Sequence, residues 1–197
     1  SRVLSDGVGG FTVGVLVQAN YGKRDWLRID GVPVGREIGL EAVPSAWDPP
    51  RSGGARPSAS GAPDAGSGSI IVVVATDAPL LPHQCERLAQ RAGLGIARVG
   101  GTGGHGSGDL FIAFATGNRF PVPSQTQPEP LVLDVRAVGD AVIDPLFDAV
   151  IESTEEAIVN ALVAAESMTG RDGNTAHRLP HDLLVEVMAR YGRPPSE

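Results

Sequence analysis

The chain has 197 residues, of which 42% are hydrophobic, and its formal net charge is −7 at pH 7. This length and composition suit one ordinary domain, or a large part of one, with a sizeable core. Because the basic residues are scattered and no long apolar run occurs, the sequence argues against a nucleic-acid-binding surface and a membrane span. The single cysteine, Cys85, excludes an intrachain disulfide and a cysteine-rich zinc site.

Two β-rich stretches near the start of the chain predict strands. Residues 11–20 (FTVGVLVQAN) are apolar, β-branched and bounded by glycines, which favours a buried strand. Residues 26–34 (WLRIDGVPV) predict a strand pair with a turn at Asp30 and Gly31. Because the step between the two stretches is short, the sequence also allows a hairpin between them.

A flexible, exposed loop is predicted over residues 44–68, which are rich in Pro, Gly, Ser and Ala and have almost no large apolar side chains. A loop of this length inside a compact domain indicates a functional, processed or inserted segment. Order resumes at Ser69, and residues 70–75 (IIVVVA) predict a central strand covered on both faces.

A helix is predicted to begin with Pro82 and to end at Gly93, with Cys85 and Leu88 on one side. The next elements are, in order, a glycine-rich stretch over 100–108, a buried strand over 109–116, a proline-rich loop over 121–129 and a short strand over 131–135.

The clearest helical pattern covers residues 144–168 and is predicted to end at Gly170. Its apolar stripe comprises Leu146, Phe147, Val150, Ile151, Thr154, Ala157, Ile158, Ala161, Leu162 and Ala165. A last helix is predicted over residues 181–191, with an inward face of Leu184, Val187, Met188 and Tyr191. The order of the elements predicts an α/β layered domain with helices packed on a sheet.

Ser69 stands where the predicted loop meets a buried strand, and a chain can be cut at such a place without loss of its fold. A cut after Gly68 would give Ser69 a free α-amino group, which titrates near pH ~8 and lies beside the Ser69 hydroxyl. One residue would then supply both the nucleophile and the general base. Glycine at position 68 would ease the attack on the preceding carbonyl, since glycine adopts conformations that other residues resist. A Gly-Ser pair also occurs in many loops that have no such role.

Polar groups at two other strand ends are further candidates. Ser107 and Asp109 place a hydroxyl and a carboxylate at the start of a buried strand, where the carboxylate could hold an N-terminal ammonium. An ordinary turn followed by a strand-starting aspartate is the alternative interpretation. Asn20 ends an apolar strand, and its amide either donates to an oxyanion or only terminates the strand.

The remaining candidates have simpler structural interpretations. His105 lies in the glycine-rich turn and is a candidate for substrate contact. Cys85 is expected to be a core thiol, and Ser1 precedes a polar, flexible stretch that does not suit a nucleophile. The glycine-rich stretch lacks the Lys-Ser/Thr pair of a phosphate-binding loop and precedes a strand. No metal-ligand spacing relates the four histidines His83, His105, His177 and His181.

Five stretches in order carry a family resemblance: FTVGVLVQANYG (11–22), GVPVG (31–35), GSIIVVVATDAPLLPHQ (68–84), GSGDLFIAFATGN (106–118) and TEEAIVNALVAAESMTGRDG (154–173). With these stretches the chain resembles the DmpA-type family of N-terminal-nucleophile hydrolases, which comprises L-aminopeptidase/D-esterases and β-peptidyl aminopeptidases. The resemblance covers most of the chain outside residues 39–66.

The resemblance implies a role for each candidate. Ser69 would be the nucleophile, released by autoproteolysis after Gly68. Asn20 would contribute to the oxyanion hole, and Ser107 would interact with the hydroxyl and the amine of the nucleophile. Asp109 would hold an acidic position where some relatives carry Glu, and its shorter side chain reaches less far.

The family's fold is a four-layer αββα sandwich, so the resemblance implies an α/β fold of this type, incomplete here. Residues 1–68, with the flexible loop at 44–68, would be the C-terminal part of an α-subunit region. Residues 69–197 would be a β-subunit region, and the two regions together would form part of one domain. The loop before Ser69 is longer than is usual in the family.

Family members carry a long segment before the part seen here, so the chain resembles a C-terminal fragment. The missing N-terminal segment should supply a second oxyanion donor, a tyrosine and the acidic group that binds the substrate amine. We therefore expect this chain alone to be inactive.

The resemblance implies a self-processing serine aminopeptidase that hydrolyses N-terminal residues from peptides, amides or esters. An amine-accepting acyltransferase, or a non-catalytic member of the same fold, is the alternative. No metal or organic cofactor is expected. The expected partners are a small peptide or aminoacyl amide or ester substrate, the missing N-terminal segment and further copies in a homo-oligomer, but no nucleic acid or membrane. A cytoplasmic location is favoured, and a periplasmic one stays open.

Overall fold

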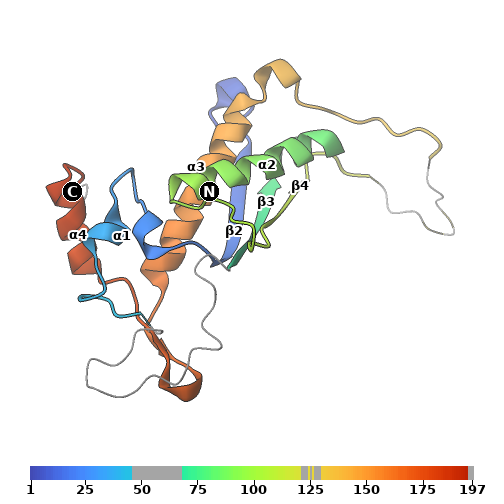
Figure 1. The fold of residues 1–197 in the computed structure, drawn as a ribbon. Coiled ribbons are helices and arrows are strands. Elements are labelled where there is room, and N and C mark those ends of the chain that lie inside the picture. The colour runs from blue at the N-terminus through green and yellow to red at the C-terminus, as the bar shows by residue number, and fades with distance from the viewer. Residues whose placement is uncertain (46–67, 121–123, 125, 127–129, 195–197) are drawn as a thin grey trace. The chain divides into compact units, whose positions relative to one another are not determined.

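The computed structural model describes residues 1–45, 68–120, 124, 126 and 130–194 (Figure 1). They form two compact units, each assembled from separate stretches of the sequence. The first unit comprises Ser1–Gln18, Ile71–Gly95 and Leu110–Ala157, and the second comprises Ala19–Ile70, Ile96–Asp109 and Ile158–Glu197. Most of the loops predicted over 44–68 and 121–129 lies outside the described residues. The predicted regions 1–68 and 69–197 stay a prediction.

The main sheet has the strand order β1-β2-β3-β4. Its strands are β1 (Arg2–Val3), β2 (Thr12–Asn20), β3 (Ser69–Thr76) and β4 (Leu110–Ala115). β1 pairs antiparallel with β2, whereas β3 and β4 run parallel, with Ile71 opposite Leu110. Since parallel neighbours need a crossover connection, helix α2 (Pro82–Arg98) joins β3 to β4. The strands predicted over 11–20, 70–75 and 109–116 are confirmed.

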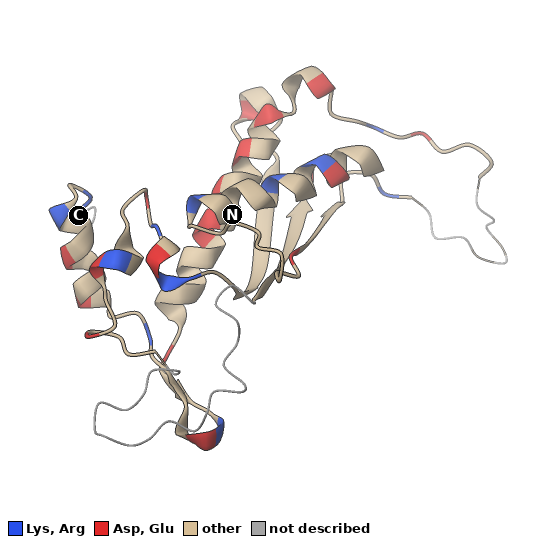
Figure 2. Ribbon diagram, in the orientation of Figure 1, with Lys and Arg blue, Asp and Glu red and all other residues tan. Residues whose placement is uncertain are grey.

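One face of this sheet is buried and the other is open. Ile70, Val72 and Val74 of β3 are fully buried, whereas Ile71, which lies between Ile70 and Val72, is exposed. The alternation follows from the pleat, which sends successive side chains to opposite faces. The prediction that residues 70–75 are covered on both faces is therefore wrong for the described residues. The open face carries the exposed apolar side chains of Leu16, Ile71, Leu110, Ile112 and Phe114, and Figure 2 shows no charged residue on β2, β3 or β4.

Helices α2 and α3 (Asp144–Ala164) form the helical layer of the first unit (Figure 1). The guanidinium groups of Arg87 and Arg91 on α2 lie 5.1 Å and 4.1 Å from the ring centroid of Phe147 on α3. Most of the apolar stripe predicted for the long helix is buried, namely Leu146, Phe147, Val150, Ile151, Thr154 and Ile158. The α/β fold class is thus confirmed.

Helix α2 continues through Gly93, where the sequence predicts its end, and stops at Arg98. A Cβ atom at Gly93 would make only an ordinary contact, 3.6 Å from the Phe111 ring. A Cβ atom at Gly95 would lie 2.6 Å from the Ile151 carbonyl oxygen and 2.7 Å from Thr154 Cβ. Gly95 therefore allows α2 and α3 to approach closely, and these glycines do not terminate the helix.

Three other predictions differ from the structure. Helix α3 ends at Ala164 rather than at 168, because β5 (Met168–Thr169) pairs antiparallel with β6 (Thr175–Ala176). Residues 131–135 form no strand, and no described segment pairs with them. Residues 26–34 form a single bridge, Ile29–Val32, and no hairpin with β2, whose neighbours in the sheet are β1 and β3. The predicted turn is present, with a φ of 48° at Asp30 and 77° at Gly31.

The second unit contains a small core between α1 (Val34–Glu37) and α4 (His181–Arg190). Its buried members are Val32, Val34, Ile38, Val43 and Val187. Glu37 accepts hydrogen bonds from Arg190 at 2.9 Å and from the hydroxyl of Tyr191 at 2.7 Å. The helix predicted over 181–191 is confirmed, but Tyr191 is exposed and ties the end of α4 to α1.

Short 3-10 helices span Asp6–Val8, Arg24–Trp26, Asp140–Val142 and Arg171–Gly173. Within the described ranges, no helix has the length and apolar character needed to cross a membrane.

Candidate active site

The parallel pairing of β3 and β4 explains why residues far apart in the sequence meet at one edge of the sheet. Parallel strands begin at the same edge, and Ile71 lies opposite Leu110. Two residues earlier in the sequence on both sides, the same register places Ser69 opposite Gly108, which precedes β4. The backbone N–H of Gly108 donates a hydrogen bond to Ser69 Oγ at 3.2 Å. The hydroxyl of Ser69 is therefore positioned by the backbone just before β4.

Ser107 links the Gly68–Ser69 bond to Asp109. Its Oγ lies 2.9 Å from the carbonyl oxygen of Gly68 and 2.5 Å from Oδ1 of Asp109. The backbone N–H of Ser107 donates to the carbonyl of Gly104 at 2.8 Å, which closes the glycine-rich turn. A serine hydroxyl carries one proton, so it donates to one of these two oxygens at a time. The hydroxyl can thus hydrogen-bond either to the carbonyl before Ser69 or to the carboxylate.

The end of β2 lies directly against Gly68. A Cβ atom at position 68 would lie 2.4 Å from the carbonyl oxygen of Asn20 and 2.9 Å from Cα of Tyr21. Glycine is therefore the residue that fits before Ser69 without a shift of the backbone. Asn20 is exposed, and the described structure gives its side-chain amide no hydrogen-bond partner. The structure thus brings the Asn20 backbone to the site without a hydrogen bond between its amide and Ser69.

Tyr21 is a neighbour of the site that the sequence did not reveal. Burial, and to a smaller extent the negative charge of Asp109, raise the pKa of Tyr21 to about 12. The phenol therefore keeps its proton at neutral pH. The hydrogen bond from the Gly108 backbone was also not predicted. If the strands before and after α2 are assumed to pair in parallel in this register, Gly108 is the residue opposite Ser69.

The other candidates are not joined to this cluster. Among the described residues, no interaction connects His105 with Ser69, although both lie in the second unit. Cys85 is partly buried in α2, and burial raises the pKa of its thiol, which makes it a poorer nucleophile.

The amine of Ser1 pairs with Glu156 at 3.0 Å. His181 Nε2 lies 2.8 Å from the carbonyl oxygen of Val163. In the described part of the chain, no three His, Cys, Asp or Glu side chains gather in a metal-binding group.

The arrangement suits an acyl shift at the Gly68–Ser69 bond. Ser69 Oγ belongs to the residue that follows the Gly68 carbonyl, and the Ser107 hydroxyl lies within hydrogen-bond distance of that carbonyl oxygen. A donor at this position stabilises negative charge that develops on the oxygen during attack. The site therefore contains the Ser69 hydroxyl, the Gly68 carbonyl oxygen within hydrogen-bond distance of the Ser107 hydroxyl, and the Asp109 carboxylate two residues after Ser107.

The sequence matches the family described as "Peptidase family S58" over residues 1–176. It is 42% identical over 193 residues to the β-peptidyl aminopeptidase BapA of Sphingosinicella microcystinivorans, and the match covers 98% of this chain and 47% of that protein. It is 43% identical over 198 residues to BapA of Sphingosinicella xenopeptidilytica, with 98% and 46% covered. The chain thus spans about half the length of these relatives.

Two solved structures show the same fold. A β-aminopeptidase from a Burkholderia species matches with a TM-score of 0.80 and 44% identity over 98% of this chain and 48% of the other. The L-aminopeptidase D-Ala-esterase/amidase from Ochrobactrum anthropi, described as a variant of the Ntn-hydrolase fold, matches with a TM-score of 0.74 and 41% identity over 98% and 47%. The fold is therefore of the Ntn-hydrolase type. With a family match over most of its length and relatives above 40% identity, the chain belongs to peptidase family S58.

Proposed function

We propose that this chain carries the nucleophile of a self-processing aminopeptidase, which is cut between Gly68 and Ser69 and then removes N-terminal residues from short peptides, amides or esters. The observation that carries the proposal is the position of the Ser107 hydroxyl, 2.9 Å from the Gly68 carbonyl oxygen and 2.5 Å from Asp109. The Gly108 N–H also donates to Ser69 Oγ, so the Ser69 and Ser107 hydroxyls and the Gly108 N–H all lie at the Gly68–Ser69 peptide bond.

In the first stage, Ser69 Oγ attacks the carbonyl carbon of Gly68. The proton of the hydroxyl passes to the amide nitrogen, the C–N bond breaks, and an ester forms between Gly68 and Ser69. The Ser107 hydroxyl stabilises the oxyanion of this step when it donates its one proton to this oxygen, 2.9 Å away, and not to Asp109. Water then hydrolyses the ester, which leaves a carboxylate on Gly68 and restores the Ser69 hydroxyl beside a new α-amine.

In the second stage, the new amine serves as the general base. A terminal amine titrates near pH ~8, so a useful fraction is neutral under physiological conditions. The Ser69 hydroxyl attacks the carbonyl of the substrate's first residue, its proton goes to the amine and then to the leaving group, and water releases the acyl-enzyme. The exposed amide of Asn20 is proposed as an oxyanion donor, and Asp109 is proposed to hold Ser107 and the terminal ammonium in place. The steps need no metal or organic cofactor.

The relatives support the substrate class. Two are named β-peptidyl aminopeptidases, and a third is an L-aminopeptidase that also acts as a D-Ala-esterase/amidase. We propose peptides and aminoacyl amides or esters as substrates of the whole protein, assembled as a homo-oligomer of processed chains. The apolar open face of the sheet supports packing against a further segment of the same protein, and we propose that this segment is the N-terminal one that the resemblance implies.

Intact-mass spectrometry of the full-length protein tests the proposal. We expect a polypeptide that begins at Ser69 in the wild-type protein, and an uncut chain without aminopeptidase activity in Ser69→Ala. Ser124→Ala, which removes the hydroxyl of an exposed serine, is the matched control and should be cut like the wild type. A Ser69→Ala protein that is still cut at this bond, or still turns over an aminoacyl p-nitroanilide, would refute the nucleophile. Adding a free amine as acceptor separates hydrolysis from acyl transfer.

A further inference from the structure

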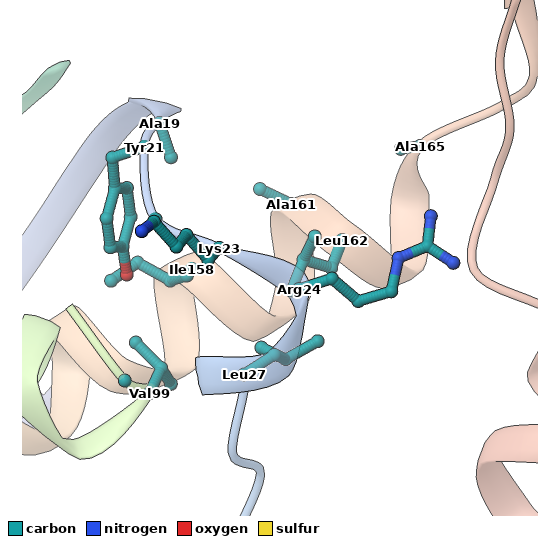
Figure 3. Close-up of a pocket in the computed structure, with 12 residues that line it drawn as sticks. Ala19, Tyr21, Lys23, Arg24, Leu27, Val99, Ile158, Ala161, Leu162 and Ala165 are labelled. Atoms are coloured by element: carbon teal, nitrogen blue, oxygen red, sulfur yellow. The ribbon is translucent and has the colours of Figure 1, made fainter. Parts of the chain in front are cut away.

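A cavity of about 330 Å³ opens in the second unit beside Tyr21 (Figure 3). Its walls are mainly apolar and include Leu27, Val99, Ile158 and Leu162. The volume is at the lower end of the range of about 300–1,000 Å³ that is usual for small-ligand sites. The cavity therefore has room for an apolar group of about the size of one residue.

Lys23 gives this cavity an available positive charge. Within the described residues it forms no ion pair, and its ammonium lies 4.7 Å from the ring centroid of Trp26. Arg24 also lines the cavity, but its guanidinium donates to the carbonyl oxygens of Val43 and Gly39. Figure 3 shows the Lys23 side chain extending toward Tyr21 and the Arg24 side chain extending the other way. Among the described lining residues, Lys23 is thus the cation that can bind an anionic group at the cavity.

The other polar features of the cavity also favour an anion. No Asp or Glu is among its described lining residues, so no carboxylate there competes for Lys23. The phenol of Tyr21, whose pKa is raised to about 12 by burial and to a smaller extent by the negative charge of Asp109, stays protonated and offers a hydrogen-bond donor. An apolar pocket with an ammonium and a hydroxyl donor is complementary to an apolar group that bears a carboxylate.

The cavity lies within reach of the Gly68–Ser69 bond. A Cβ atom at Gly68 would lie 2.9 Å from Cα of Tyr21, which lines the cavity. Adding one Cα–Cβ bond and one Cα–Cα step places Tyr21 Cα within about 8 Å of Ser69 Cα. An extended residue spans about 3.3–3.6 Å, so the residue one or two positions after a bond cleaved at Ser69 can reach the cavity.

We propose that this cavity binds the carboxy-terminal residue of a short peptide substrate, with its apolar side chain between the apolar walls and its carboxylate on the ammonium of Lys23. The inference rests on the proposed function and narrows its substrates to short peptides with a free carboxylate and an apolar last residue. Lys23 acts in this scheme as a determinant of specificity and takes no part in bond cleavage.

The charge is tested in the full-length, self-processed enzyme with β-alanyl-leucine and β-alanyl-leucinamide, which differ only in the terminal carboxylate. We expect the ratio of kcat/KM for the acid to that for the amide to fall about fivefold in Lys23→Met, the size of effect of one exposed ion pair. Lys23→Arg should keep the ratio within about twofold of the wild type, because it keeps the charge. Raising the salt concentration should lower the ratio in the wild type and not in Lys23→Met.

The apolar walls are tested by filling the cavity. Ala161 is exposed on α3 and lines the cavity, so Ala161→Leu reduces the space without disturbing the buried core. We expect the preference for β-alanyl-leucine over β-alanyl-glycine to fall about tenfold, as expected when a buried leucine side chain loses its site. Ala164→Leu makes the same change at an exposed residue of the same helix that does not line the cavity, and should leave the preference unchanged.

The two proposals fail in different ways. An acid-to-amide ratio that stays the same in Lys23→Met would overturn the inference, even with normal Ser69-dependent hydrolysis of β-alanyl-p-nitroanilide. Equal losses on the acid and the amide would also overturn it, since they would show a structural role for Lys23 on Trp26. If no substrate were hydrolysed in a Ser69-dependent way, the proposed function itself would fall, and this inference with it.

Discussion

At the scale of single residues, the backbone N–H of Gly108 positions the Ser69 hydroxyl of the candidate site through a hydrogen bond of 3.2 Å. A Cβ atom at position 108 would lie 3.0 Å from Ser69 Oγ, closer than such contacts normally occur. Gly108 has no positive φ, so alanine would not strain the backbone there. The hydroxyl of Ser69 would have to rotate away instead. We expect Gly108→Ala to fold normally and to slow self-cleavage about tenfold or more, because small misplacements of reacting atoms are costly.

The time course of precursor conversion, followed by intact mass or gel electrophoresis, measures this effect. Gly39→Ala is the control, because a Cβ atom there would meet no atom within 4 Å. Cleavage of Gly108→Ala at the wild-type rate would show that the contact with the Ser69 hydroxyl does not govern the reaction.

The site shows how far residue patterns predict function. The sequence points to Ser69, Ser107, Asp109 and Asn20 only through a family resemblance, because each has an ordinary turn or strand-end interpretation of its own. The contact between Ser107 and the Gly68 carbonyl depends on the parallel register of β3 and β4, which links residues 39 positions apart. Local periodicity carries no information on that register. Tyr21 was missed for the same reason, since its ring lies against Gly101, 80 positions later in the sequence, where an added Cβ atom would be 2.8 Å from Tyr21 Cε2.

At the scale of secondary-structure elements, replacement by alanine is expected to have opposite effects on stability at Gly93 and at Gly95. Alanine is better than glycine in a helix by about 1 kcal/mol, so Gly93→Ala, with an ordinary 3.6 Å contact to Phe111, should stabilise the protein by up to that amount. At Gly95 the new methyl would press on the Ile151 carbonyl and Thr154 of α3. We expect Gly95→Ala to be destabilising by about 2 kcal/mol, the usual cost of overpacking.

Chemical denaturation of the two variants gives the free energies of unfolding, with Gly93→Ala as the matched control for Gly95→Ala. Equal free energies of unfolding for the two variants would mean that α2 and α3 can move apart at little cost and that their packing does not require glycine at position 95.

The secondary-structure elements differ in how well the sequence predicts them, and α2 with its glycines shows why. Strands β2, β3 and β4 follow from continuous apolar runs, and helices α3 and α4 from apolar periodicity, and both patterns act within a single element. The end of α2 does not, because glycine in a helix pattern indicates either a terminus or a close contact with another helix. Only the position of α3 decides between them. Residues 131–135 likewise have the composition of a strand, but a strand also needs a partner, and the described residues supply none.

At the scale of the whole molecule, the open face of the sheet is the main feature that the described residues leave unexplained. Leu110, Ile112 and Phe114 of β4 project from the same face as Ile71, and no described residue covers them. An apolar sheet face normally packs against another layer. The chain spans about half the length of the curated relatives, and we propose that a further layer of a longer protein buries this face.

Ile112→Asp distinguishes a covered face from an exposed one. Ile112 is 52% exposed in this chain, so in the isolated chain the aspartate should cost little stability and should reduce self-association through the apolar face. In the full-length protein the same carboxylate would be buried without a partner, which we expect to lower stability by about 3 kcal/mol or more. Leu94→Asp, at a side chain on α2 that is 53% exposed, is the control and should have little effect in either. Thermal unfolding and light scattering of both lengths measure the two effects. A full-length Ile112→Asp protein as stable as the wild type would show that the face stays open to water, because a buried charge at this position could not be accommodated without cost.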